Sequence, residues 1–310
     1  MTTALPVSIV IPCYNAAATL AATLASAIPE NPAQIIIIDD GSRDDTLAIA
    51  RAHEPAVSVI SGPNRGASLA RNTGIAAACE PWIVFLDADD FLTPGTLAQR
   101  IGTAHATRAD VVACDWEDVI DDGAGALTPG ARHCADWAAL EADAERAIAA
   151  HVWVTTAALL YDRALVSRIG GFRADLPVIQ DARFMFDAAF HGGRFAHAAH
   201  VGARYRVVAG SLSRRDPAAF WADVLRNGAQ IEALWRARGL DAARRKVIAG
   251  IYDTASRGLL RAADPRFFEA AARQRGLREP LPLHSRIAHP LARAVGLRAA
   301  HALLAGLGRA

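Results

Sequence analysis

The chain has 310 residues, which suggests one or two domains and is long enough to bury a large core. Hydrophobic residues make up 52% of it and charged residues 21%, so the composition excludes a wholly disordered protein. There are 33 Lys and Arg residues against 32 Asp and Glu residues. The resulting net charge of +1 argues against a nucleic-acid-binding protein, which usually carries a strong basic excess.

Cysteine spacing and the lack of targeting signals point to the cytoplasm. Cys13, Cys79, Cys114 and Cys134 form no C-x-x-C pair, which argues against a zinc knuckle or a thioredoxin motif. The first residues lack the basic and apolar regions of a signal peptide. No stretch reaches the roughly 18 apolar residues that a membrane-spanning helix needs. We therefore expect a soluble cytoplasmic protein with reduced cysteines.

Short apolar runs alternate with helical patterns over the first 115 residues. The runs that predict buried strands are 7–11, 35–39, 57–60, 82–86 and 110–114. The segments between them that are long enough for crossover helices are 16–28, 44–53, 67–79 and 94–107. This repeated β-α-β order predicts an α/β fold with a doubly wound, mostly parallel, Rossmann-like sheet.

The pattern changes after about Trp116. We expect a loop from Asp121 through the following Gly and Pro residues. Beyond this loop we expect helices at 137–150, 163–169 and 181–191, a strand at 157–161 and a strand-rich segment at 194–208. From Pro217 onward the pattern is helical. We therefore predict a domain at 1–215, made of halves 1–115 and 116–215, and a helical C-terminal region at 216–310.

The C-terminal segment is basic and amphipathic. Glu279 is the last acidic residue, and the arginines that follow it are Arg286, Arg293, Arg298 and Arg309, with Leu, Ile and Val between them. Such a segment can lie on an anionic membrane surface. Alternatively, it is a terminal helix that packs on the domain and turns its arginines to solvent.

Acidic residues follow two of the predicted strands, at the sheet edge where open α/β folds bind ligands. Asp39 and Asp40 end the second strand, and Asp87, Asp89 and Asp90 follow the fourth. Like charges this close need a cation or hydrogen-bond donors. Because alternate residues of an extended segment share a side, Asp87 and Asp89 are able to hold Mg²⁺ or Mn²⁺ together, with open positions for phosphate oxygens.

Two further residues have both a binding and a plain structural interpretation. Asp40 is placed to accept a hydrogen bond from a nucleobase N–H, or it belongs to a turn with Gly41 and Ser42. Arg71 lies one turn into the helix that follows Gly66, where it can reach a base or a phosphate. A single arginine on a helix is otherwise an ordinary surface residue.

Four segments in this order resemble family-2 glycosyltransferases of the GT-A fold. They are Ser8–Asn15 (SIVIPCYN), Ile36–Thr46 (IIIDDGSRDDT), Asn64–Gly74 (NRGASLARNTG) and Trp82–Asp90 (WIVFLDADD). The resemblance covers about residues 5–215 and leaves the helical remainder out.

The resemblance implies a nucleotide-sugar site and a metal site. The residues that it assigns to the nucleotide sugar are Pro12, Tyr14, Asp40, Arg71 and Asp87. Pro12 and Tyr14 would line the nucleoside pocket, and Asp40 would bind the base, typically uracil. Arg71 would support the nucleotide and Asp87 would lie near the ribose. The Mn²⁺ or Mg²⁺ that bridges the diphosphate would be bound by a further residue, Asp89.

The family's catalytic base stands in a Glu-Asp pair after a Gly-Gly-Phe segment. Here Gly170-Gly171-Phe172 precedes Gln180 and Asp181, so the resemblance implies that Asp181 is the base and that Gln180 replaces the Glu. Asp181 would take the proton of the attacking hydroxyl while the nucleoside diphosphate leaves from the opposite face, which inverts the anomeric centre. The plain structural interpretation makes Asp181 a helix N-cap, and both roles can coexist.

The sequence also departs from the family. Val208 stands where the family often has a metal-binding His, so the third ligand is absent or comes from elsewhere, such as His191, His197 or His200. The Gln-x-x-Arg-Trp motif of processive synthases is not found, which favours transfer of a single sugar over polymer extrusion.

These residues favour a metal-dependent, inverting, hexosyltransferase-type enzyme with a UDP-linked donor. Its acceptor would be a hydroxyl of a saccharide, glycolipid or protein, in bacterial surface polysaccharide or glycolipid synthesis. One alternative is a catalytically impaired relative that binds a nucleotide sugar or a partner protein. A nicotinamide-dependent oxidoreductase is disfavoured because the first strand-helix turn reads PCYNAAA rather than G-x-G-x-x-G.

Overall fold

A computed structural model of the chain describes residues 3–122, 126–207 and 215–306. The chain divides into two compact units, one made of Met1–Glu145 with Val152–Ala209 and the other of Arg146–His151 with Gly210–Ala310. We call them the sheet unit and the helical unit. A functional domain boundary at 215/216 stays a proposal.

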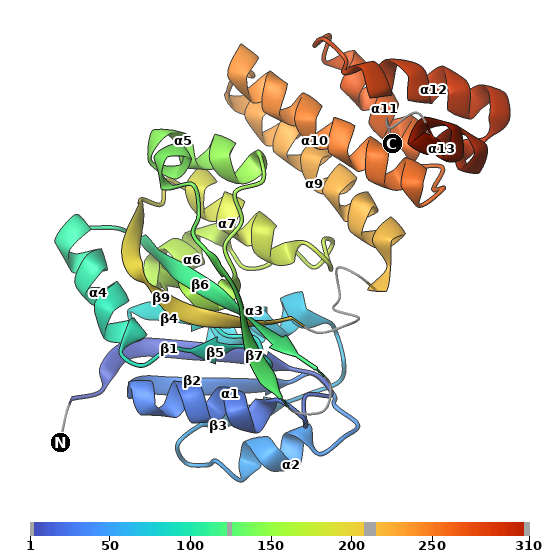
Figure 1. Cartoon of the computed structure of the whole chain (residues 1–310). Helices are drawn as coiled ribbons and strands as arrows, with labels where there is room; N and C mark the ends of the chain where they lie inside the picture. The colour runs from blue at the N-terminus through green and yellow to red at the C-terminus, as the bar shows by residue number, and fades with distance from the viewer. Residues whose placement is uncertain (1–2, 123–125, 208–214, 307–310) are drawn as a thin grey trace. The chain divides into compact units, whose positions relative to one another are not determined.

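The strands of the sheet unit form one large sheet in the described residues (Figure 1). They are β1 (Leu5–Cys13), β2 (Pro32–Asp39), β3 (Ser58–Ser61), β4 (Trp82–Phe85), β5 (Phe91–Leu92), β6 (Val111–Asp121), β7 (Leu127–His133), β8 (Leu159–Asp162) and β9 (Phe195–Val207). Their order is β3-β2-β1-β4-β8-β6-β9-β5, with β7 paired to β6. The pairing is parallel along β3-β2-β1-β4 and between β6 and β9, and antiparallel elsewhere. The predicted α/β fold with a mostly parallel sheet is therefore confirmed.

Helices flank this sheet. They are α1 (Leu20–Ala27), α2 (Thr46–Arg51), α3 (Ala67–Ala77), α4 (Thr96–Thr107), α5 (Trp137–Ala149), α6 (Arg163–Ile169) and α7 (Gln180–Phe190), with short 3₁₀ turns η1 (Ile28–Glu30) and η2 (Thr156–Ala158). Helix α3 packs closely on β1, because a Cβ atom on Gly74 would collide with the side chain of Val10. The glycine lets this helix approach the sheet, and that approach sets the position of the residues on its first turns.

The strand register aligns the edge that carries the site. Cys13, at the end of β1, pairs with Asp39 at the end of β2. Val10 of β1 pairs with Phe85, the last residue of β4. The residues that follow β4 therefore lie beside the carboxyl end of β1. The apolar residues of β1 and β4 are buried in the core. Burial of these strands therefore fixes which polar residues meet at their carboxyl ends.

One predicted loop is a strand. The sequence analysis expects a loop from Asp121 through the following Gly and Pro residues, but β6 extends to Asp121 and Leu127–His133 form β7. Pro129 and Gly130 look like loop residues, yet a proline is tolerated on an edge strand. Gly130 is needed there, because a Cβ atom would lie 2.8 Å from Cβ of Asp118 on β6.

The helical unit holds α9 (Pro217–Arg238), α10 (Ala242–Arg261), α11 (Phe267–Gly276), α12 (Leu283–Val295) and α13 (Leu297–Gly306). The carboxylates of Asp216 and Asp241 cap α9 and α10 by accepting from the amides of Ala219 and Arg244. The expected helical C-terminal region is therefore present. Among the described residues, no helix combines the length and the apolar character that crossing a membrane requires.

Candidate functional site

The carboxyl ends of β1, β2 and β4 bring acidic side chains together, as the sequence predicts. Cys13, the last residue of β1, has a buried thiol on which the charges of these side chains act. Burial raises the pKa of this thiol, and the charges of Asp39, Asp87, Asp44 and Asp89 raise it further. Carboxylates from two strand ends and from the loop before α2 therefore surround one point of the sheet edge.

Asp40 fastens the loop that leads into α3. Its side chain is buried, and its two oxygens accept from the backbone amides of Arg65 at 2.9 Å and Gly66 at 2.8 Å. Gly66 has a φ of 91°, a conformation that favours glycine. The donors that the sequence analysis expects from a nucleobase are thus partly supplied by the chain itself, and one lone pair on each oxygen is left for a ligand.

The segment after β1 lies beside the loop after β2. Pro12 is half-buried near the end of β1, and Tyr14 is 48% exposed. Asn15 connects the two loops, because its amide donates to Oγ of Ser42 at 3.0 Å and its Oδ1 accepts from the amide of Arg43 at 2.9 Å. The exposed Tyr14 ring therefore stands on a braced turn at the acidic edge.

Arg71 is a buried cation with spare donors. Its Nη2 donates to Oδ1 of Asp87, and its guanidinium lies over the ring of Phe172 at 5.3 Å. Its Nε and Nη1 are buried and have no hydrogen-bond partner among the described residues. Leaving such donors unpaired costs free energy, and an anion that reaches them removes the cost. Arg71 is therefore no ordinary surface residue.

Asp87, Asp89 and Asp90 differ in their surroundings. Burial, and then the charge of Asp87, raise the pKa of Asp89 to about 6, although the positive charges of Arg206 and Arg71 act against this. Asp90 is fully buried, which raises its pKa well above the ordinary value, and its Oδ1 accepts from the amide of Arg206 at 2.9 Å. Asp90 is thus part of the support, while Asp87 and Asp89 act on one another as like charges.

Arg206 supports the acidic segment that follows β4. Its Nε donates to the backbone carbonyl of Asp89 at 2.9 Å, and its Nη1 donates to Asp121 at 2.8 Å. Its guanidinium also lies 5.0 Å from the ring centre of Phe91. The sequence analysis assigned no role to Arg206, so this supporting role was missed. Val208 itself lies outside the described residues.

The acidic pair fits a hard divalent cation. Two carboxylates that destabilise one another by charge, beside an arginine with unpaired donors, suit a cation together with the anion that it carries. The two histidines on β9 that the sequence analysis weighed as a third ligand have partners of their own. His197 lies 2.8 Å from Asp115, and His200 lies 3.0 Å from Oγ1 of Thr96.

Asp181 lies in the first turn of α7 and contacts an indole. Oδ2 of Asp181 accepts from Nε1 of Trp153 at 3.0 Å. The N-cap of α7 is Ile179, and no side chain caps this end, so the interpretation of Asp181 as an N-cap is wrong. Trp153 has no motif around it, and the sequence analysis missed it.

Tyr205 links the acidic segment to Asp181. Burial raises its pKa to about 12, and the charges of Asp90, Asp87, Asp89 and Asp181 contribute in that order. Its ring also packs edge-on against Trp153, with centroids 5.9 Å apart. The charge of Asp181 and those of the acidic segment therefore act on one side chain. Contacts also join the two groups, because Trp153 bonds Asp181 and packs against Tyr205, whose neighbour Arg206 bonds Asp89.

Helix α3 connects the two groups of residues. Oγ of Ser68 donates to Oε1 of Gln180 at 2.6 Å, so the side chain that replaces the family's Glu is tied to α3. Asn72, one turn later, accepts from the amide of Phe172 at 2.7 Å and donates to its carbonyl at 2.9 Å. Gly171 has a φ of 107°, and a Cβ atom there would lie 2.6 Å from Oδ1 of Asn72. Gly171 is thus required by this clamp.

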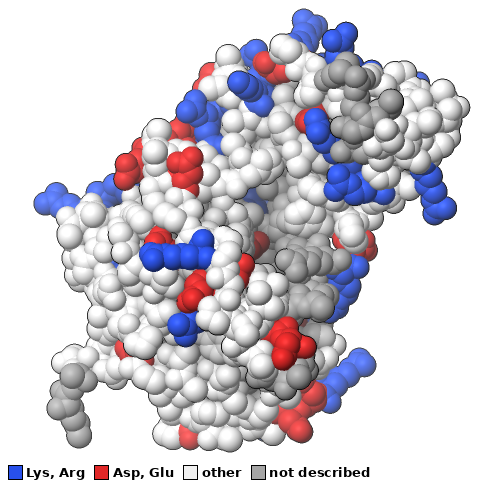
Figure 2. All heavy atoms as spheres, viewed as in Figure 1, with Lys and Arg blue, Asp and Glu red and all other residues white. Residues whose placement is uncertain are grey.

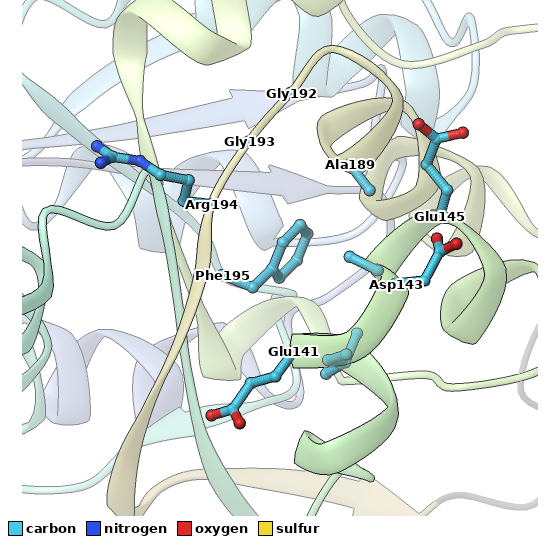
Figure 3. Close-up of a pocket in the computed structure, with 10 residues that line it drawn as sticks. Glu141, Asp143, Glu145, Ala189, Gly192, Gly193, Arg194 and Phe195 are labelled. Carbon is cyan, nitrogen blue, oxygen red and sulfur yellow. The ribbon is translucent and has the colours of Figure 1, made fainter.

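A pocket of about 410 Å³ lies elsewhere in the sheet unit (Figure 3). It is lined by Glu141, Asp143 and Glu145 of α5, by the segment Gly192–Phe195 and by Ala189 of α7. Asp143 has non-helical backbone angles, which interrupt α5 at this wall. No residue that the sequence analysis assigned to the site lines this pocket.

Comparison with known proteins finds a family model that matches part of this chain. Residues 8–140 match the model of "Glycosyl transferase family 2". Among curated proteins, the succinoglycan biosynthesis protein ExoU of Rhizobium meliloti is 44% identical over 108 residues, which are 33% of this chain and 32% of that protein. ExoO of the same organism is 36% identical over 121 residues, 38% of this chain and 35% of that protein. The chain thus spans about a third of the length of these relatives.

Solved structures share the fold over nearly the whole chain. Staphylococcus aureus TarS 1–349 in complex with UDP-GlcNAc has a TM-score of 0.69 at 16% identity, covering 98% of this chain and 93% of that one. The mannosyltransferase PcManGT from Pyrobaculum calidifontis, in complex with GDP-Man and Mn²⁺, has a TM-score of 0.58 at 18% identity, covering 98% and 85%. At these identities the likeness shows the fold alone.

Proposed function

Because residues 8–140 form a glycosyl transferase family 2 domain, we propose that the chain transfers one sugar from a nucleotide sugar to an acceptor hydroxyl with inversion at the anomeric carbon. The observation that carries the proposal is a chain of contacts between Asp181 and the acidic segment after β4: Trp153 donates to Asp181 and packs against Tyr205, and the next residue, Arg206, donates to the carbonyl of Asp89. A base opposite a diphosphate site is the arrangement that a single displacement needs.

The donor would bind across the carboxyl ends of β1, β2 and β4. We propose that Tyr14 and Pro12 contact the nucleoside, that Asp40 accepts from the base with its remaining lone pairs, and that Arg71 turns its unpaired nitrogens to the diphosphate. UDP is the favoured nucleotide. The complexes of TarS with UDP-GlcNAc and of PcManGT with GDP-Man show that this fold accepts different nucleotides, so the base needs a direct test.

Asp89, with Asp87 beside it, would hold Mn²⁺ or Mg²⁺. Such an ion, when bound, neutralises the negative charge that develops on the departing diphosphate. The chain's own contribution is to fix the acidic segment. Arg206 holds the carbonyl of Asp89, and Arg71 holds the carboxylate of Asp87.

The acceptor side is built around Asp181. We propose that its carboxylate takes the hydroxyl proton while the acceptor oxygen forms the new bond to the anomeric carbon and the bond from that carbon to the diphosphate oxygen breaks. Trp153 would hold the carboxylate in place for this transfer. The acceptor would be a saccharide, a glycolipid or another hydroxyl compound. Relatives named for succinoglycan biosynthesis favour surface polysaccharide synthesis in a bacterium.

The helical unit supports a proposal of peripheral contact with the inner face of the plasma membrane from the cytoplasm. Arg286, Arg293 and Arg298 are exposed on α12 and α13, and Figure 2 shows Lys and Arg side chains over the helical unit. Val295 and Leu303 are exposed apolar residues at 46% and 52%. Basic and apolar side chains on the same helices suit an anionic lipid surface. Co-sedimentation with anionic vesicles that the double variant Arg293→Glu, Arg298→Glu abolishes would support this contact. Equal sedimentation of both proteins would contradict it.

The first experiment tests the proposed nucleotide and metal site. UDP, GDP, CDP and dTDP are added to the purified chain with and without Mn²⁺, and the melting temperature is recorded. A nucleotide at about 100 times its Kd stabilises the protein by about 2.7 kcal/mol. We expect a UDP shift that needs the metal, that Asp89→Ala abolishes and that Asp181→Asn retains.

The second experiment measures the chemistry itself. Slow hydrolysis of the nucleotide sugar, or transfer to an added acceptor, should fall about 10²- to 10⁴-fold in Asp181→Asn. Full activity of Asp181→Asn would exclude Asp181 as the base. Nucleotide binding without any turnover, under all acceptors tried, would favour the catalytically impaired relative.

A further inference from the structure

A second group of metal-binding side chains lies in the sheet unit, separate from the acidic segment after β4. Asp115 of β6, His197 of β9 and Cys134, which directly follows β7, each offer one ligand atom, and these atoms all lie within 4.8 Å of one another. Strand β6 pairs with both β7 and β9, so the sheet brings together residues that are far apart in sequence.

The two oxygens of Asp115 have different partners. Oδ1 lies 2.8 Å from Nε2 of His197, and Oδ2 accepts from Nη2 of Arg132 at 2.7 Å. Trp137 stacks on the ring of His197, with centroids 4.4 Å apart and planes 15° apart. Oδ1 of Asp115 and Nε2 of His197 are thus in contact with one another, while Arg132 and Trp137 hold the carboxylate and the imidazole in orientation from outside, as the outer partners of metal ligands do.

We propose that Asp115, Cys134 and His197 form a binding site for a thiol-preferring divalent cation of the Zn²⁺ type. Thiolate, imidazole and carboxylate are the ligands that Zn²⁺ takes in proteins, whereas Mg²⁺ and Mn²⁺ prefer oxygen. The carboxylate of Asp115 and the thiolate of Cys134 balance the charge of the ion. Because Cys134 is exposed, the ion can enter from solvent and keep a water as its fourth ligand.

The site would brace the neighbourhood of Asp181 without taking part in the transfer. Trp116 follows Asp115 directly, and its ring stacks on His133, the neighbour of Cys134, at 5.2 Å. Trp116 also packs edge-on against Trp153 at 5.7 Å, and Trp153 donates to Asp181. An ion that joins β6 to the end of β7 would therefore hold the aromatic residues behind that indole.

A hydrogen-bonded cluster without a metal is the competing explanation, because the thiol of Cys134 also hydrogen-bonds to Asp115; such a cluster does not respond to Zn²⁺. Exposed Cys79 serves as the internal control, since it lies outside the cluster. The full-length chain is stripped with a chelator and alkylated with a maleimide, with and without Zn²⁺, and each cysteine is followed by peptide mass spectrometry. We expect Zn²⁺ to slow the alkylation of Cys134 about tenfold or more and to leave Cys79 unchanged, because the metal-bound thiolate is withdrawn from reaction. Equal rates at Cys134 with and without Zn²⁺, or equal protection of both cysteines, would overturn the proposal.

Cobalt substitution separates this site from the acidic segment after β4. Co²⁺ bound by a thiolate shows a ligand-to-metal charge-transfer absorption that carboxylates alone do not give. We expect one equivalent of Co²⁺ to give this absorption in the wild type, in Cys79→Ser and in Asp89→Ala, but not in Cys134→Ser. An absorption that persists in Cys134→Ser, or that Asp89→Ala removes, would contradict the assignment.

Discussion

The indole Nε1 of Trp153 donates to Oδ2 of Asp181 at 3.0 Å, across 28 residues of sequence. This bond leaves Oδ1 of Asp181 and the second lone pair of Oδ2 to meet a ligand. The ring of Trp153 is itself held between Trp116 and Tyr205, which both meet it edge-on. The direction of the Asp181 carboxylate is thus set by an aromatic group that reaches back to β6 and β9.

Removal of this hydrogen bond should slow transfer. In Trp153→Phe an aromatic ring remains but the indole N–H donor is lost. A hydrogen bond to a charged group contributes about 1.5–3 kcal/mol, so we expect kcat to fall about tenfold or more. The nucleotide-induced thermal shift should stay unchanged, because Trp153 contacts Asp181, the proposed catalytic base, and none of the proposed donor residues. The control is Trp221→Phe on α9, which should keep wild-type kcat. Wild-type kcat in Trp153→Phe would show that the bond does not matter.

Arg71 should be needed for nucleotide binding, and lysine should not replace it. A lysine at this position carries its three N–H donors on one nitrogen, so it cannot bond Asp87 with one nitrogen and present two other, separate nitrogens to a diphosphate as the guanidinium of Arg71 can. We expect both Arg71→Ala and Arg71→Lys to weaken UDP binding about tenfold or more, measured by calorimetry. Arg51→Ala, an exposed arginine at the end of α2, should bind like the wild type. Full affinity in Arg71→Lys would mean that only the charge matters.

Gly171 and Gly170 offer a matched pair for testing the clamp by Asn72. Both have positive φ, but a Cβ atom on Gly171 would collide with Asn72, whereas one on Gly170 would meet nothing within 4 Å. Strain alone costs of order 1–3 kcal/mol. We therefore expect Gly171→Ala to lower the free energy of unfolding in urea by more than Gly170→Ala does. Equal losses would show that Asn72 gives way.

The metal response should depend on pH through Asp89. Its folded pKa is raised to about 6, so in the metal-free protein its contribution to stability is complete below its ordinary pKa and is lost as the pH rises through about 6. Metal binding needs the ionised carboxylate and has the opposite dependence. The increase in melting temperature caused by Mn²⁺ should therefore grow between pH 5 and about pH 7. In Asp89→Asn this growth should disappear, and a pH-independent increase in the wild type would rule out Asp89 as the ligand.

The sequence predicted those parts of the site that depend on local pattern. Asp87 and Asp89 directly follow a short buried strand, so their place at the sheet edge follows from the order of strands and helices. Asp181 was proposed from the resemblance to the family, which has its base after a Gly-Gly-Phe segment and before a helix. The helix start was placed one residue late, and this error made Asp181 look like an N-cap.

Contacts between distant segments could not be predicted in the same way. Nothing around Trp153 indicates that its indole reaches Asp181, because that contact depends on how the segment before β8 packs against α7. Pro129 and Gly130 made β7 look like a loop, since their use on an edge strand depends on the partner strand β6. Arg206 is similar, because its contacts with Asp89 and Asp121 arise only when β9 lies beside β6.

Helix α3 connects the proposed donor residues with the segment that carries Asp181. Its N-terminal loop is tied to Asp40, its next turn carries Arg71, and Ser68 and Asn72 hold the segments that precede and begin α7. A helix of 11 residues moves as one body, so a displacement at its donor end is passed on to Gln180 and its neighbour. The distance between the proposed diphosphate site and Asp181 would therefore depend on the position of α3, and a nucleotide that draws α3 inward would move Gln180 and Asp181 with it.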